Sequence, residues 1–290
     1  MRNLPFKPPV IIGIILLVMF YIFPLNEAEE SIIFFPLNEN VHFTSAQTDL
    51  DLLAAKKNQS FQVKWSIRSL LQQKAYLRQD IGLLFMNGKL KGLLNEWKQN
   101  TDLMEENTII SGRESSYIQA ISFHYAEIHN GDEQITSADR ITSAKLFVID
   151  SAFSPLTAFK TPSNSEEREW KGVLEKTGLN QQQQIINDAS KKYKINLNQF
   201  YPISINDLEK YETTPFPNFT LPQTQNILGK LWEGIYKNYF LGIKTADGTI
   251  VSPIESTAPI IFIPKTGTEL YVITQTKDKE LILLKQRINE

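Results

Sequence analysis

The segment from Pro8 to Leu25 places the strongest constraint on what this chain can fold into. Its eighteen residues contain no charged side chain. A helix of that length would extend about 27 Å, close to the hydrocarbon thickness of a bilayer, which is about 30 Å. The sequence therefore predicts a transmembrane helix over residues 8–25, in contact with the lipid bilayer.

Charges on the two sides of this segment predict its orientation. Arg2 and Lys7 precede it, whereas three glutamates follow it within five residues. Positively charged residues next to a membrane helix favour the cytoplasmic side. We therefore expect residues 1–7 in the cytoplasm and the rest of the chain outside, as a single-pass protein of the cell membrane with a signal-anchor.

A cleaved signal peptide is the alternative interpretation of the same segment. Its apolar core would fit Val10 to Phe23. Cleavage requires small residues one and three positions before the cut, and the tripeptide Asn26-Glu27-Ala28 supplies only one of them. We expect an uncleaved anchor; cleavage would instead give a secreted soluble binding protein.

Composition limits the chemistry that the chain can perform. It contains no cysteine, which excludes disulfides, thiolate nucleophiles and cysteine-ligated metals. Of the 30 lysines and arginines, Arg2 and Lys7 precede the apolar segment, which leaves 28 against 32 acidic residues and a net charge of −4. This balance gives no electrostatic reason to expect a nucleic acid partner.

Alternation of apolar and polar residues predicts a β-rich lobe over residues 31–160. Phe61, Val63, Trp65 and Ile67 fall on one face of a strand, with polar residues between them. Asn87 and Gly88 separate two apolar runs and accept the positive φ angles of a type I′ turn, so a hairpin is expected there. Further strands are predicted over Tyr117–Ile128 and Lys145–Asp150, and a short helix over Thr44–Lys57, where Leu50, Leu53 and Ala54 have helical spacing.

The remaining residues, 161–290, carry the pattern of an α+β lobe. Ser163 and Glu166 have the spacing of a capping box, and we expect the helix that follows to end at Gly178. A second helix is predicted from Asn180, in which the run of four glutamines forms a polar face. An amphipathic helix is predicted around Ile227–Tyr239, followed by strands over Ile260–Ile263, Glu269–Thr276 and Glu280–Arg287.

The predicted elements come in the order strands, helices, strands. This order differs from the alternation of strands and helices in a βαβ protein. It predicts an α+β ectodomain with mainly antiparallel sheet and several packed helices. The last three strands could form a sheet of their own, which would give two lobes, or pair with the first sheet, which would give one domain. The sequence leaves these two arrangements open.

No known catalytic or metal-binding motif occurs in the chain. It lacks the Gly-x-Ser-x-Gly, P-loop, EF-hand and His-Glu-x-x-His patterns. His124 and His129 are five residues apart on a predicted strand, so they face opposite sides of it and cannot share a metal. We assign no catalytic, cofactor-binding or metal-binding residue and expect no cofactor, although an envelope hydrolase with dispersed carboxylates remains an alternative.

Aromatic residues supply the candidate partner surface. They lie on the amphipathic helix and in the proline-rich segment before it, and aromatic side chains are enriched at protein interfaces. Alternatively, the helical stripe packs against the sheet. The candidate residues are Phe216, Phe219, Trp232, Tyr236 and Tyr239.

These observations together predict a membrane-anchored extracytoplasmic binding or regulatory protein that contacts another envelope protein. The layout is similar to that of Gram-positive single-pass accessory proteins that modulate sensor kinases or wall enzymes. This resemblance is one of architecture, without a shared motif, and it implies no site residue.

Overall fold

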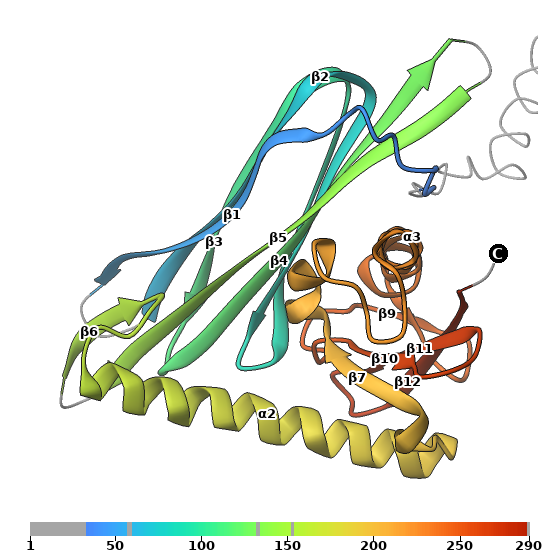
Figure 1. Ribbon diagram of the computed structural model, residues 1–290. Coiled ribbons are helices and arrows are strands. Elements are labelled where there is room, and N and C mark those ends of the chain that lie inside the picture. Colours follow the sequence, from blue (N-terminus) through green and yellow to red (C-terminus); the bar gives the residue numbers. More distant parts are fainter. Residues whose placement is uncertain (1–32, 57–59, 132–133, 152–153, 289–290) are drawn as a thin grey trace, which may run out of the picture. The chain divides into compact units, whose positions relative to one another are not determined.

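A computed structural model describes residues 33–56, 60–131, 134–151 and 154–288. The predicted transmembrane segment lies outside these residues, and none of the helices that the structure describes is long and apolar enough to cross a membrane. Figure 1 shows the arrangement of the elements. They are β1 (Phe43–Lys56), β2 (Ser60–Met86), β3 (Lys89–Gly112), β4 (Ser116–Asn130), β5 (Gln134–Ser151), β6 (Ser154–Phe159), α2 (Ser165–Tyr193), η1 (Leu197–Gln199), β7 (Phe200–Ser204), η2 (Ile205–Glu212), α3 (Leu221–Ile235), the π-helical turn η3 (Tyr236–Phe240), β8 (Ile243–Lys244), β9 (Ile250–Val251), β10 (Ile260–Pro264), β11 (Glu269–Gln275) and β12 (Leu281–Arg287).

The first sheet contains six antiparallel strands and is organised by β2, which has 27 residues. The first part of β2 pairs with β1 and the second part pairs with β4, while β3 follows β2 through both parts. The β2–β3 register shifts between Leu70 and Ala75. Such an irregularity bends a strand, and it allows β2 to change partner from β1 to β4.

This bend folds the sheet into two layers. Trp65 and Gly82 are seventeen residues apart on β2, which would separate them by about 56 Å in a straight strand. In the structure, a Cβ atom on Gly82 would lie 2.5 Å from Cζ2 of Trp65. The two parts of β2 therefore face each other across a core formed by Leu50, Phe61, Val63, Trp65, Ile67, Leu84, Met86, Ile118, Ala120, Leu146 and Val148.

Two local predictions within this sheet are confirmed. The side chains of Phe61, Val63 and Trp65 are buried on one face of β2, as their alternation indicates. Asn87 and Gly88 have φ angles of 51° and 77° and join β2 to β3 as a hairpin. The short buried strand predicted over Lys145–Asp150 is the end of the longer β5.

The predicted helix over Thr44–Lys57 is wrong, because this segment is strand β1. It pairs with β2 in a register that places Leu50 opposite Trp65. Thr48 and Leu50 are buried whereas Asp49 and Asp51 are exposed, so the side chains follow the two-residue period of a strand. Pairing with β2 outweighs the helical spacing of Leu50 and Leu53, since that spacing is only a weak local preference.

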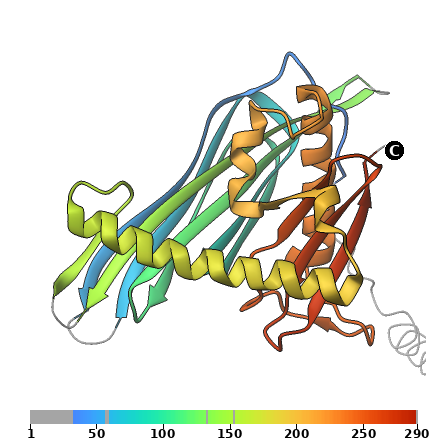
Figure 2. The same cartoon turned by 60° about the horizontal axis from the view of Figure 1, so that its bottom comes forward.

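Helix α2 contacts both sheets, as Figures 1 and 2 show. Near its N-terminus, Trp170 and Leu174 pack against the aromatic cluster of Tyr117, Phe147 and Phe159 on the first sheet. Toward its C-terminus, Ile185, Ile186 and Ala189 pack against Ile260, Phe262 and Ile273 of the second sheet. The helix therefore connects the two sheets along its length.

The prediction of two helices divided at Gly178 is wrong, because α2 is one helix of 29 residues. Its N-cap is Asn164, whose side chain accepts a hydrogen bond from the Glu167 backbone, one residue later than the predicted capping box. It ends at Lys194, which has a φ of 55°. A glycine in a helix interior costs about 1 kcal/mol relative to alanine, which two capped ends and packing on both sheets can offset.

The second sheet has the antiparallel order β12-β11-β10-β7, and Figure 2 shows it beside the C-terminal part of α2. The three C-terminal strands thus pair among themselves and with β7, and the α+β class with mainly antiparallel sheet is confirmed. Leu90 at the start of β3 exchanges backbone hydrogen bonds of 2.9 Å with Glu255 and Ser256. Residues Ile33–Glu290 form one compact unit, and the division into lobes at residues 160 and 161 stays a prediction.

Close packing between the two layers predicts that an alanine at position 82 is poorly tolerated. The added Cβ would lie 2.4 Å from Cδ1 of Ile67, so the layers must separate or the side chains must leave their rotamers. We expect Gly82→Ala to lower the free energy of unfolding by about 1–3 kcal/mol, measured by urea denaturation. In Gly92→Ala the closest contact would be 3.1 Å, and a loss as large as that of Gly82→Ala would contradict this explanation.

Candidate functional site

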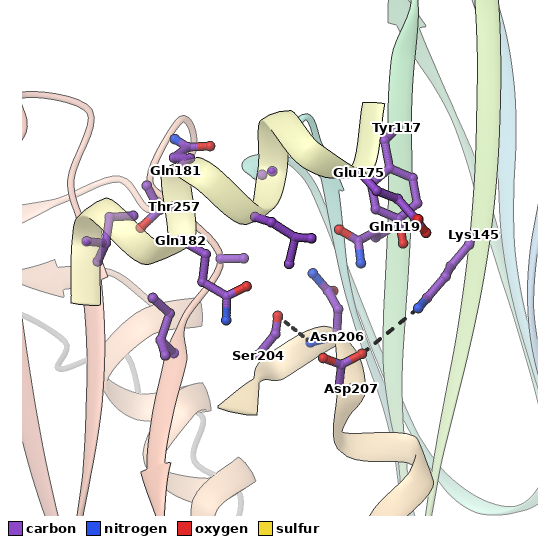
Figure 3. A pocket seen from close by; sticks show the side chains of 16 residues that line it. Tyr117, Gln119, Lys145, Glu175, Gln181, Gln182, Ser204, Asn206, Asp207 and Thr257 are labelled. Carbon is purple, nitrogen blue, oxygen red and sulfur yellow. Dashed lines mark hydrogen bonds and ion pairs between the residues drawn. The ribbon is translucent and has the colours of Figure 1, made fainter. Parts of the chain in front are cut away.

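A cavity of about 270 Å³ lies where α2 passes from the first sheet to the second, and we refer to it as the α2 cavity. Figure 3 shows its walls, which come from α2, β4 and β5, the β7–η2 segment and the chain around Thr257. The residues that line it are Gly88, Tyr117, Gln119, Lys145, Glu175, Gly178, Leu179, Gln181, Gln182, Ile185, Ser204, Asn206, Asp207, Thr257, Ala258 and Ile260.

Sheet pairing positions the β-strand wall of this cavity. Tyr117 and Gln119 are two residues apart on β4 and therefore project from the same face. Gln119 lies directly opposite Lys145 of β5 in the register. Gly88 in the β2–β3 turn approaches α2 so closely that a Cβ atom would lie 2.7 Å from Oε1 of Gln181. Glycine at this position thus allows the hairpin to touch the helix beside the cavity.

Asn206 is a buried polar residue of this cavity, and its side-chain oxygen lacks a hydrogen-bond partner. It is 4% exposed, at the start of η2, and its backbone N–H donates to the Ser204 hydroxyl at 3.3 Å. The side chain points from η2 toward Gln119 (Figure 3), and its Oδ1 atom has no hydrogen-bond partner. A buried unpaired polar atom costs about 1–3 kcal/mol, so the protein leaves part of the hydrogen-bonding capacity of this carboxamide unused at the cavity wall.

The cavity carries its charged groups at one end. Lys145 and Asp207 form an ion pair with 3.9 Å between Nζ and Oδ1, and both side chains are 44% exposed. Burial raises the pKa of the Tyr117 hydroxyl, and the negative charges of Glu175 and Asp207 raise this pKa further. Both carboxylates therefore act on the same hydroxyl.

Carboxamide and hydroxyl groups dominate the remaining polar lining. Gln119, Gln182 and Asn206 each offer a donor and an acceptor, while Leu179, Ile185 and Ile260 supply apolar surface. A concave site with a few convergent polar groups and apolar walls is typical of small-molecule binding. The α2 cavity is therefore suited to the reversible binding of a small polar molecule.

The candidate partner residues do not form an exposed patch. The side chains of Phe216, Trp232, Tyr236 and Tyr239 are buried, and Phe219 is half-buried. Trp232 stacks on Phe123 of β4 with ring centroids 5.2 Å apart. Trp232 of α3 therefore packs on the first sheet, and the role of the five residues as a partner surface stays a prediction.

His124 belongs to a buried hydrogen-bond network. Its Nδ1 lies 2.9 Å from Oδ2 of Asp80, and its Nε2 lies 2.9 Å from Oγ1 of Thr142. Ser69 donates to the same Asp80 carboxylate at 2.6 Å. All four side chains are buried, so the network joins β2, β4 and β5 inside the core. Among the described residues, no group of three His, Cys, Asp or Glu could hold a metal ion.

Asp139 and Glu212 form a carboxylate pair that the sequence does not reveal. They line a pocket of about 70 Å³ together with Arg140. Glu212 accepts a hydrogen bond from the Ile141 backbone N–H, and its Oε2 atom lies 3.0 Å from Nε of Arg140. These contacts connect η2 to β5. Burial raises the pKa of both carboxyls to about 7, and the charge of Glu212 adds to the increase for Asp139.

Other glutamates of the described residues have structural contacts. Glu167 accepts a hydrogen bond from the Ser163 backbone before α2, and Glu105 pairs with Arg68 at 2.5 Å. Burial raises the pKa of Glu106 to about 7, with a further contribution from Glu96. None of these residues lines the α2 cavity.

Comparisons with known proteins give no match for this chain among protein-family models, curated proteins or solved structures. The site therefore rests on its geometry alone. The sequence predicts the strand that carries Tyr117. It gives no sign that Asn206 and Asp207 line a cavity. The one local signal was the glutamine run, because Gln181 and Gln182 face the cavity.

The raised pKa values of Asp139 and Glu212 predict how stability changes with pH. Between the unfolded values, about 4, and the folded value of about 7, the folded chain binds more protons than the unfolded chain. This contribution to stability is complete below about pH 4 and is lost as the pH rises through about 7.

We therefore expect Asp139→Asn to lose less stability than the wild type between about pH 5 and about pH 8, measured by urea denaturation at each pH. Glu166→Gln removes an exposed carboxylate of α2 and serves as the control. Parallel profiles for the wild type and Asp139→Asn would show that this carboxyl does not contribute.

Proposed function

We propose that this protein is a single-pass, membrane-anchored extracytoplasmic binding protein. It holds a small polar ligand in the α2 cavity and contacts another envelope protein. The observation that carries the binding function is the buried Asn206 side chain, which lies on the cavity wall with its Oδ1 atom unpaired. The anchor and the envelope partner rest on the apolar segment 8–25 and the charges on its two sides.

The size of the α2 cavity supports a small ligand. Its volume of about 270 Å³ is slightly below the range for pockets that bind drug-sized ligands, about 300–1,000 Å³. Its walls are held by separate contacts of α2 with each sheet. The site is thus formed before a ligand enters, which lowers the ordering cost of binding.

Helix α2 offers a route from ligand binding to regulation. Gln182 lies on the cavity wall, while the same helix packs on the first sheet at Trp170 and on the second at Ile185. A ligand between α2 and η2 stabilises the arrangement that contains the cavity, by an amount set by its concentration and affinity. A partner that contacts this arrangement would then respond to the ligand.

Two glycines of α2 provide a matched test of the cavity. A Cβ atom at either Gly172 or Gly178 would meet no heavy atom within 4 Å, but only Gly178 lines the cavity. We expect Gly178→Leu to fill the cavity and abolish binding, whereas Gly172→Leu retains it. Both variants should be at least as stable as the wild type, because leucine favours a helix over glycine by up to about 1 kcal/mol.

Binding would be measured as the shift in melting temperature of the full chain with a panel of dipeptides, monosaccharides and disaccharides. The proposal expects at least one compound to raise the melting temperature of the wild type and of Gly172→Leu, with no shift for Gly178→Leu. A wild type that responds to no member of the panel, or equal shifts in all three proteins, would contradict it.

The predicted anchor has its own test. We expect the full chain to stay in the membrane fraction after washing at alkaline pH and to begin with Met1, because an uncleaved helix over residues 8–25 spans the bilayer. Deletion of residues 8–25 should transfer the protein to the supernatant. An extracellular form that lacks the first residues would instead show cleavage.

A further inference from the structure

We infer that the ligand of the α2 cavity is a short peptide with a free amino group. Its ammonium lies between Glu175 and Asp207, and its peptide group meets the side chains of Asn206 and Gln119. This inference rests on the proposed binding function of the same cavity and names the class of ligand. The charges, the carboxamides and the apolar wall each support it.

Negative charge at one end of the cavity selects a cation. Glu175 and Asp207 oppose the single positive charge of Lys145 among the lining residues. The partners of these carboxylates are distant, because Lys171 lies 3.8 Å from Glu175 and Lys145 lies 3.9 Å from Asp207. A direct charge-assisted hydrogen bond is about 2.7–2.9 Å, so both carboxylates can still accept hydrogen bonds from a ligand.

An ammonium group matches the acceptors at this end of the cavity. It has three donors, and the Tyr117, Glu175 and Asp207 side chains all line the cavity (Figure 3). Two carboxylates and a phenol give an ammonium one acceptor for each donor. A ligand carboxylate or phosphate would meet two negative charges at the same place.

Carboxamides in the cavity wall match a peptide group. The Oδ1 atom of Asn206 has no hydrogen-bond partner, and the Asn206 side chain points toward Gln119 (Figure 3). A carboxamide donates and accepts in one plane, as a peptide group does, so the two can form paired hydrogen bonds. Leu179, Ile185 and Ile260 provide apolar contacts for a small side chain.

The decisive comparison uses two probes that differ only at the amino group, alanyl-alaninamide and its N-acetyl derivative. Isothermal titration of the full chain in detergent micelles would measure both dissociation constants. We expect the free amine to bind and N-acetylation to weaken binding at least about tenfold, equivalent to about 1.4 kcal/mol. A neutral disaccharide serves as the third probe.

Variants of the two carboxylates identify where the ammonium lies. Glu175→Gln and Asp207→Asn should each weaken binding of the free amine by about tenfold, and neither should change the binding of the N-acetyl form. Glu166→Gln, in the exposed first turn of the same helix, should bind like the wild type. The half-exposed Glu175 can be replaced without disturbing the core, so this variant tests the inference even if Asp207→Asn is unstable.

The outcomes separate the inference from the proposed function. Equal affinity for the free and acetylated peptides, or binding of the disaccharide alone, would overturn the peptide ammonium while leaving a binding cavity. Failure of all three probes would overturn the inference, and failure of the wider panel as well would overturn the binding function. Weaker binding by Glu175→Gln, confined to the free amine, would support the ammonium position.

Discussion

The contact between Trp65 and Gly82 is the constraint on which the rest of this structure depends. Two positions of one strand meet only because β2 bends between Leu70 and Ala75 and turns the sheet into two layers. The indole fills the space that a side chain at position 82 would occupy. The second part of β2 pairs with β4, and α3 packs on this part of the sheet. Strand β4 in turn pairs with β5, and these two strands carry Tyr117 and Lys145 to the cavity.

The chain separates its buried polar groups into two kinds. Ser69, His124 and Thr142 form hydrogen bonds within the first sheet together with Oδ2 of Asp80, while Oδ1 of Asp80 has no hydrogen-bond partner and lies 3.5 Å from Nη2 of Arg78. Asn206 lies instead on the wall of the α2 cavity, where its Oδ1 atom has no hydrogen-bond partner. Buried polar networks make a core specific, whereas a carboxamide on a cavity wall can also bond to a molecule in the cavity. This difference distinguishes the α2 cavity from the histidine network.

The sequence predicts those elements whose pattern is local and strong. Alternation at Phe61–Ile67, the Asn87-Gly88 turn and the apolar stripe around Trp232 all correspond to observed elements. The bend of β2 could not be predicted, because it depends on packing between residues seventeen positions apart. Gly178 predicts a helix end, but this local signal carries no information about the contacts of α2 with two distant sheets. Asn206 and Asp207 have no neighbouring motif, and only the fold brings them to Tyr117.

The α2 cavity has walls from residues as far apart as Gly88 and Ile260. No single sheet or helix contains enough of the wall to form it, so the cavity exists only after both sheets and α2 have assembled. Contacts between such distant residues are associated with slow folding. A ligand that binds there would therefore add its binding free energy to the stability of the whole compact unit, and would couple the unfolding of the second sheet to that of the first.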